Sequence, residues 1–292
     1  MSSRAKLTSS IESDASIKKL SWPVLQALLK PREKQANKGD FGHVLIVGGD
    51  YGYAGAVCMA GCAALRVGAG LVSIATRVEH ARQMFTVQPE LMAHGIELES
   101  DPAVLEALLK RADVIVIGPG LGQSEWAQEL AQQIFASNKP CVIDADALAL
   151  FARAQPLALN AVITPHPGEA ARLLQCSVTA VQNDRLLAIQ KLVDQFKVTT
   201  VLKGANTLIL DSVSPVECCV AGNPGMATGG MGDVLAGMIA GVIAQKIPLT
   251  QAAKIAVMCH ALAGDRVAQQ SGQRGMLATD CLPVIQQLMN GK

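Results

Sequence analysis

The residues best suited to chemistry lie in one glycine-rich stretch, residues 222–237, which reads GNPGMATGGMGDVLAG. Its glycines permit positive φ and a close approach of the backbone to a ligand. The apolar run that follows, residues 234–244, predicts a helix that begins just after them. Free N–H groups and the positive end of the helix dipole make such a start an anion site, most often for phosphate. The amides expected to form this anion hole belong to Gly229, Gly230, Met231 and Gly232.

Asp233 follows these glycines, where the field of the predicted helix is strongest. Two interpretations stay open from this stretch alone. The carboxylate either only complements the helix dipole, or it is a catalytic base held beside a phosphate. Because glycine-rich loops are common, the rest of the chain has to decide between them.

Short apolar runs that end in polar or glycine-rich clusters recur along the chain. The run at 44–47 leads into a glycine-rich loop, a helix over 56–67 and a strand over 71–76, which together predict a βαβ unit. Further strands are expected at 113–117, 141–143, 161–163 and 198–202, with 208–210 as an antiparallel partner of the last. Helices are expected over 22–30, 125–135, 249–270 and 279–289. Because parallel strands share one carboxyl edge, where ligands of such folds bind, five separate segments are predicted to converge on one crevice.

The polar residues of these clusters each have a structural and a functional interpretation. His166 lies between two prolines and suits a helix cap and a ligand contact equally well. Lys203 could be a solvated charge, but the glycine and threonine after it favour contact with a phosphate tail. Asp144 and Asp146 suit a turn and an N-cap better than a metal pair, for at least one of them, and we propose no metal ligands.

Composition favours one large α/β domain. Half of the 292 residues are hydrophobic and only 3% are aromatic, which favours α/β layers over an all-β sandwich. The 25 basic and 24 acidic residues are well mixed, so neither nucleic acid nor an anionic membrane is an expected partner. The eight cysteines form no C-x-x-C pair and are expected to be mostly buried, reduced thiols.

The ends of the chain and its apolar runs predict its organisation. Residues 1–37 are expected to form an N-terminal leader with one short helix, and residues 38–292 a single domain. No apolar run reaches the length of about 18 residues that a spanning helix needs. The polar N-terminus lacks the apolar core of a signal peptide, which predicts a cytoplasmic protein.

Seven motifs in order make the chain similar to the ADP-dependent NAD(P)H-hydrate dehydratase family. They are KGDFGHVLIVGG, AGA with ALRVGAGLV, GPGLG, DADAL, TPHPGE, VLKGANT and NPGMATGGMGDVLAG. They extend from about residue 38 to the C-terminal helix. The resemblance implies a ribokinase-like fold, a three-layer α/β/α arrangement with a mostly parallel central sheet.

The resemblance also implies an activity, the repair of a damaged nicotinamide cofactor. The S epimer of hydrated NADH or NADPH (NADHX or NADPHX) is converted back to the reduced cofactor while ADP becomes AMP and phosphate, with Mg²⁺ as a further cofactor. Asp233 then acts as the base beside the anion hole. The residues implied to hold the nucleotide are Lys203, Gly204, Ala205, Asn206, Thr207 and Gly232. Those implied to face the hydrated cofactor are Ala56, Gly120 or Gly122, His166 and Asp233.

Two expectations about partners follow from the family. Many relatives carry a fused epimerase domain, and the roughly 37 residues before the first motif are too few for a domain. Epimerisation is therefore expected from a separate protein. Relatives form homo-oligomers, which makes a homo-oligomer the expectation here as well.

Two rival functions remain open. A small-molecule kinase of the same fold, such as a hydroxymethylpyrimidine or thiazole kinase, shares the G-x-G-D anion hole but not KGANT, TPHPGE and the long glycine motif together. A catalytically silent nucleotide-binding or regulatory protein is the second rival. The presence of both Asp233 and Lys203 argues against it.

Overall fold

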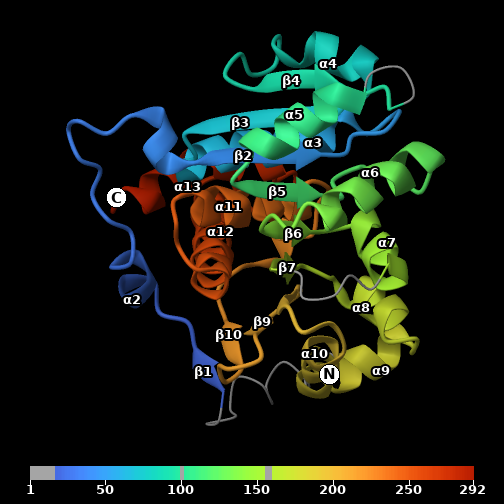
Figure 1. Ribbon diagram of the computed structural model, residues 1–292. Helices are drawn as coiled ribbons and strands as arrows, with labels where there is room; N and C mark the ends of the chain where they lie inside the picture. Colours follow the sequence, from blue (N-terminus) through green and yellow to red (C-terminus); the bar gives the residue numbers. More distant parts are fainter. Residues whose placement is uncertain (1–16, 99–101, 155–159) are drawn as a thin grey trace.

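A ten-stranded sheet forms the centre of the computed structural model, which describes residues 17–98, 102–154 and 160–292 (Figure 1). The strand order is β1-β10-β9-β8-β7-β6-β5-β2-β3-β4. Only β9 is antiparallel to its neighbours, β8 and β10, and all other pairs are parallel. The predicted, mostly parallel sheet is therefore confirmed, as is the antiparallel partner of β8.

The strands are β1 Lys18–Lys19, β2 His43–Val47, β3 Leu71–Thr76, β4 Met92–Gly95, β5 Val114–Ile117, β6 Cys141–Ile143, β7 Ala161–Ile163, β8 Thr199–Leu202, β9 Thr207–Leu210 and β10 Glu217–Cys219. The α-helices are α2 Trp22–Gln26, α3 Ala54–Val67, α4 Val78–Met84, α5 Pro102–Arg111, α6 Glu125–Ala136, α7 Asp146–Ala154, α8 Pro167–Leu173, α9 Val178–Asn183, α10 Arg185–Phe196, α11 Met231–Ala244, α12 Leu249–Ser271 and α13 Cys281–Met289. Short 3-10 turns cover Lys38–Phe41, Pro224–Met226 and Ala278–Asp280.

The direction of the chain through the sheet reverses between β2 and β5. From β2 the chain passes outward to β3 and β4, then returns to β5 on the other side of β2 and continues through β6, β7 and β8. In register, Val44 of β2 faces Val72 of β3 on one side and Val114 of β5 on the other. Such a reversal leaves a crevice beyond the carboxyl ends of the two strands, where ligands of doubly wound sheets bind.

Helices cover both faces of the sheet, which gives the expected three layers. Val44 and Ile46 of β2 belong to a core shared with α3, α11, α12 and α13. Leu45 and Val47 belong to a second core with α5 to α8 and α10. Figure 1 shows the orange and red helices α11 to α13 on one side of the sheet and the green to yellow helices α6 to α9 on the other. Burial on both faces explains why β2 is apolar throughout.

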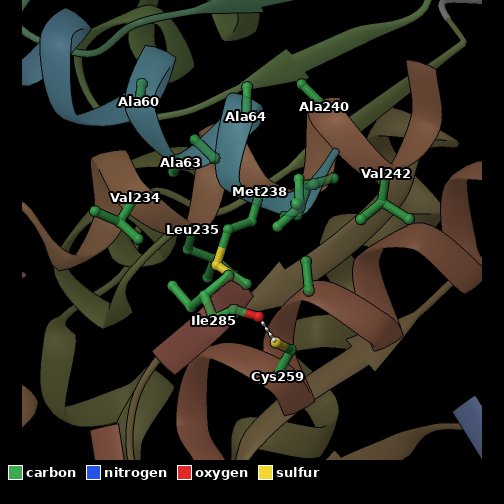
Figure 2. Close-up of a cluster of buried hydrophobic side chains, with 14 of the residues drawn as sticks. Ala60, Ala63, Ala64, Val234, Leu235, Met238, Ala240, Val242, Cys259 and Ile285 are labelled. Atoms are coloured by element: carbon green, nitrogen blue, oxygen red, sulfur yellow. Dashed lines mark hydrogen bonds between the residues drawn. The ribbon is translucent and has the colours of Figure 1, made fainter. Parts of the chain in front are cut away.

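Helices α3 and α11 pack against each other through glycines. A Cβ placed on Gly237 would lie 2.0 Å from the carbonyl oxygen of Ala60, and one on Gly241 would lie 2.7 Å from that of Ala64. The alanines of α3 line its side of this core (Figure 2). Because both contacts advance by four residues in the same direction, the helices run parallel. One turn earlier, the same register brings Asp233 of α11 to the level of Ala56 of α3.

Most predicted boundaries agree with the structure, and four differ by two residues or more. The helix expected at 279–289 begins at Cys281, after a 3-10 turn over Ala278–Asp280. The helix expected at 22–30 ends at Gln26, because the next turn continues with tighter i to i−3 bonds. Helix α3 begins two residues early, at Ala54. Helix α11 begins at Met231 rather than 234, because a first helical turn needs no internal N–H partners and tolerates glycine and aspartate.

The structure bears on only some of the remaining predictions about the organisation of the chain. Residues 1–16 of the expected leader lie outside the described residues, and the described part of 1–37 adds strand β1. All eight cysteines are free thiols and six of them are buried. Among the described residues, no helix has the length and apolar character needed to cross a membrane.

Candidate active site

The loops after β2 and β5 interlock at the reversal of the sheet. Gly49 N donates to Pro119 O at 2.9 Å, and Asp50 N donates to Gly120 O at 2.7 Å. A Cβ on Gly48 would lie 2.2 Å from Pro119 O, so the loops can approach this closely only with glycine there. The interlocked loops form one wall of the crevice.

The interlocked loops bring together three of the residues predicted to face the substrate. A Cβ on Gly120 would lie 3.3 Å from the Cβ of Ala56, so these two positions are in contact. Gly122 lies farther along the loop, where its N–H donates to Asp146 Oδ2 at 2.9 Å. Both loop glycines have positive φ, 57° and 71°. Gly120 and Gly122 therefore follow one another along the crevice wall that begins at Ala56.

A partly buried ion pair lies at the carboxyl ends of β6 and β8. Lys203 Nζ, at the end of β8, is 2.6 Å from Asp144 Oδ1, which follows β6. Thr164 Oγ1, at the end of β7, donates to the same oxygen at 2.7 Å. Lys203 Nζ also lies 3.9 Å from Glu169 Oε2. Three neighbouring strand ends thus position one lysine, two carboxylates and one hydroxyl.

The anion hole predicted from the sequence lies directly beside this ion pair. The first i to i−4 bond of α11 runs from Val234 N to Gly230 O, so the amides of residues 231–233 precede the helical hydrogen-bond pattern. A Cβ on Gly232 would lie 3.3 Å from Lys203 Nζ and 3.4 Å from Asp144 Oδ2. A phosphate at the Gly232 amide would therefore also be within reach of the ammonium group of Lys203.

Asp233 is a half-buried carboxyl with an altered proton affinity. Burial, aided by the charge of Asp144 and opposed by that of Lys203, raises the pKa of Asp233 to about 6. At neutral pH the group is therefore mostly ionised, yet it binds a proton far more readily than a free aspartate. A proton affinity near the working pH is what a general base requires.

The charge of Lys203 is secured by its neighbours. Burial by itself lowers the pKa of Lys203, but the carboxylates of Asp144 and Glu169 outweigh this, and its pKa is raised. The lysine therefore remains a cation where a phosphate would approach. Burial also raises the pKa of Glu169, an effect that the charge of Lys203 opposes.

His166 is the N-cap of helix α8, as one of its two interpretations predicted. Its Nδ1 accepts from Gly168 N at 2.9 Å and from Glu169 N at 3.2 Å, while Glu169 Oε2 accepts from His166 N at 2.7 Å. The ring Nε2 lies 3.3 Å from Glu169 Oε1, and half of the side chain remains exposed. The capping role fixes the ring at the crevice and leaves one edge accessible to a ligand.

The segment predicted to hold the nucleotide is a tight turn between β8 and β9. Gly204 and Asn206 have positive φ, 136° and 57°, and Thr207 Oγ1 donates to Gly204 O at 2.9 Å. Gly204 and Ala205 are exposed, whereas Asn206 is buried. The turn therefore presents its first residues to solvent beside Lys203.

The sequence analysis did not identify Arg185, whose guanidinium donates hydrogen bonds to the backbone of this turn. Its guanidinium, 8% exposed, donates to Leu202 O at 3.0 Å, to Asn206 O at 3.3 Å and to Lys203 O at 3.4 Å. No acidic partner of Arg185 occurs among the described residues. Arg185 begins helix α10, where no motif marks it, so the sequence carried no signal for this contact.

The glycines of the predicted anion hole differ in how closely other atoms surround them. Gly230 is the N-cap of α11 with φ of 90°, and a Cβ there would meet Met59 of α3. Gly229 is exposed, with no atom within 4 Å of a Cβ placed on it, and the Met231 side chain is buried. In the described part of the chain, no three His, Cys, Asp or Glu side chains form a metal cluster.

The fold and this site define the class of the protein. The fold is that of a ribokinase-like superfamily protein of Enterococcus faecalis, whose solved structure superposes with a TM-score of 0.87 at 32% identity, covering 95% of this chain and 96% of its own. The family model for NAD(P)H-hydrate dehydratase matches residues 44–287. The chain therefore belongs to the NAD(P)H-hydrate dehydratase family, as its motifs predicted.

Two relatives and one solved structure illustrate the family match. The bifunctional NAD(P)H-hydrate repair enzyme Nnr of Coxiella burnetii is 48% identical over 93% of this chain and 55% of its own length. The ADP-dependent (S)-NAD(P)H-hydrate dehydratase of Neisseria meningitidis is 36% identical over 90% of both chains. The ADP/ATP-dependent NAD(P)H-hydrate dehydratase of Bacillus subtilis, co-crystallised with ATP and Mg²⁺, superposes with a TM-score of 0.83 at 26% identity, covering 95% of this chain and 99% of its own. The chain spans about half the length of the bifunctional relatives.

Proposed function

We propose that this chain catalyses the ADP-dependent dehydration of the S epimer of hydrated NADH or NADPH. The observation that carries the proposal is the contact between the start of α11 and the Lys203–Asp144 pair, with Gly232 beside both charged groups. The names of the relatives supply the substrate class. The site supplies a base, an anion hole and a cation, which are the parts that phosphoryl transfer requires.

The chemistry begins with a poor leaving group. Water added across a ring double bond has left a hydroxyl, and Asp233 accepts the proton of that hydroxyl as its oxygen attacks the terminal phosphorus of ADP. The bond from this phosphorus to the bridging oxygen breaks, and AMP leaves. The phosphorylated ring then loses phosphate and one ring proton, which restores the double bond.

The remaining residues position the two reactants. The amides of Gly229, Gly230, Met231 and Gly232 would hold the transferring phosphoryl group, with Lys203 facing the same group from the end of β8. The turn from Gly204 to Thr207 would hold the rest of the nucleotide. Ala56, Gly120 and Gly122, which follow β2 and β5, and His166, which follows β7, would hold the hydrated ring and its attached groups.

Mg²⁺ fits this site as a nucleotide-borne ion. Mg²⁺ commonly takes one or two protein carboxylates and otherwise binds substrate phosphates and water. Asp144 and Asp233 lie next to the Gly232 amide and could supply such carboxylates, consistent with the lack of a three-residue cluster in the described residues. The ion would neutralise phosphate charge.

An absorbance assay at 340 nm tests the proposal. Purified protein is given hydrated NADH with and without ADP and Mg²⁺, and AMP and phosphate are measured at the end. The reduced-nicotinamide band should grow only with ADP, with one AMP and one phosphate formed per NADH. If ADP raises the melting temperature but no band grows, the kinase and the silent binder replace this proposal, and a screen of small alcohols for phosphorylation separates those two.

A further inference from the structure

A second cavity opens beside the candidate active site, between helices α7 and α8. It has a volume of about 510 Å³, and Gln123, Asp146 and Glu169 are among the residues that line it. Gln123 directly follows Gly122 in the chain, and Glu169 contacts His166. The cavity therefore begins where the two outermost predicted substrate contacts lie.

The walls of this cavity combine an apolar surface with two guanidinium groups. Leu148, Ala149 and Ala152 of α7 face Leu173 of α8, and Arg153 and Arg172 lie among them, one from each helix. The apolar part of this wall suits a purine base, and arginine is the side chain best matched to phosphate oxygens.

The acidic groups that line the cavity already have hydrogen-bond partners in the protein, whereas its two guanidinium groups have few. Asp146 accepts from Gly122 N, and Glu169 accepts from His166 N, so both acids already have protein partners. Arg153 makes one long contact, Nη2 to Gln123 Oε1 at 3.3 Å. The guanidinium of Arg172 makes no hydrogen bond or ion pair with the residues that the structure describes. The free N–H groups of the two guanidinium groups therefore favour the binding of an anion.

We propose that this cavity receives the adenosine half of the dinucleotide substrate, with Arg153 and Arg172 facing its phosphates. The inference rests on the proposed function, in which the nicotinamide half lies at Asp233. A dinucleotide extended from that point toward Gly122 and His166 would reach Gln123 and Glu169, which line the cavity. Binding energy from this remote half would then hold the reacting ring in position.

The first test compares a full substrate with a truncated one. Parent protein, the Arg153→Ala/Arg172→Ala double variant and an Arg82→Ala control on α4, also an exposed arginine, are assayed on hydrated NADPH, hydrated NADH and hydrated reduced nicotinamide mononucleotide. The last compound lacks the adenosine half. The double variant should raise KM by about tenfold or more for the hydrated dinucleotides. Its KM for the mononucleotide and its affinity for ADP should match the parent and the control.

The second test fills the cavity. Ala149→Trp places a large ring on the wall of the slot, and it should raise KM for hydrated dinucleotides while leaving turnover of the mononucleotide unchanged. Unchanged KM values for hydrated NADH and NADPH in both variants, or a loss of ADP affinity instead, would overturn the assignment of the cavity. Failure of the parent protein to produce NADH from hydrated NADH with ADP would instead count against the proposed function, so the two failures are distinguishable.

Discussion

The substitution Gly237→Ala tests how the fold positions Asp233, the proposed catalytic base. The added Cβ would lie 2.0 Å from Ala60 O and 2.7 Å from Ala60 C, and real Cβ atoms essentially never come within 3.0 Å of another heavy atom. Both partners are backbone atoms of α3, so no side-chain rotation relieves the contact. Helix α11 must therefore move away from α3 by about 1 Å.

This displacement has a cost that can be estimated. Overpacking of a core typically destabilises by about 1–3 kcal/mol, and a clash of two backbones belongs at the upper end. Replacing glycine by alanine inside a helix returns about 1 kcal/mol. We therefore expect a net loss of about 2 kcal/mol, which corresponds to a fall in melting temperature of about 4–8 °C.

The same displacement should affect turnover. Asp233 lies one helical turn before Gly237, so it moves with α11, and misplacement of a catalytic group by about 1 Å can reduce the rate about 10²-fold. Stability is measured by urea unfolding followed by circular dichroism, and turnover by the 340 nm assay at a temperature where the variant is folded.

Gly55→Ala in α3 is the matched control. No atom lies within 4 Å of a Cβ placed on Gly55, so this variant should be as stable as the parent or up to about 1 kcal/mol more stable. If Gly237→Ala were as stable as Gly55→Ala, the close contact of α3 and α11 would be refuted. If it were destabilised but fully active, this contact would not set the position of Asp233.

Four further predictions concern the charged groups of the site. Asp233→Asn should keep ADP affinity within a few-fold and lower kcat by about 10² or more, and near-normal turnover would remove Asp233 from the mechanism. Because the native state raises the pKa of Asp233 to about 6, native protein binds more protons than unfolded protein between the ordinary aspartate pKa and about pH 6. The stability of the parent protein should therefore fall relative to that of Asp233→Asn as pH rises through this window. Turnover by the parent should rise over the same range, because Asp233 becomes ionised. Urea titrations that show no pH-dependent difference in stability between the two proteins would contradict the shifted pKa. Lys203→Ala should weaken ADP binding measured by calorimetry, and unchanged affinity would exclude its phosphate contact. Arg185→Met, which removes the donors to three carbonyls of the nucleotide turn, should raise KM for ADP more than KM for the hydrated cofactor, with Arg172→Ala as a control whose ADP kinetics stay normal.

Much of the fold was predictable because its signals are local. The apolar runs of β2, β3, β6 and β7 end in glycine or polar clusters, and their boundaries agree with the structure to within one residue. Strands β1, β4 and β10 were not predicted. They have two to four residues and lie at or near the sheet edges, where a short segment has no distinctive hydrophobic pattern.

The candidate site was predictable only as a set of residues on one edge. The polar clusters that follow successive strands predicted that Lys203, His166 and Asp233 face the same crevice. It did not reveal that Lys203 pairs with Asp144, 59 residues away, or that Arg185 supports the nucleotide turn. Such contacts depend on side-chain reach across neighbouring strands, which no local pattern encodes.

The sequence by itself determined the strands, the family motifs and the glycines that allow backbones to approach, because these depend on residue type and short-range spacing. Only the tertiary structure decided the parallel packing of α3 on α11, with Gly237 against Ala60, and the burial that raises the pKa of Asp233 to about 6. The two helices are far apart in the chain and meet because each buries its small-residue face against the same side of the sheet. Proton affinity likewise depends on the solvent exposure and charges that surround a group, and these exist only once distant segments have packed together.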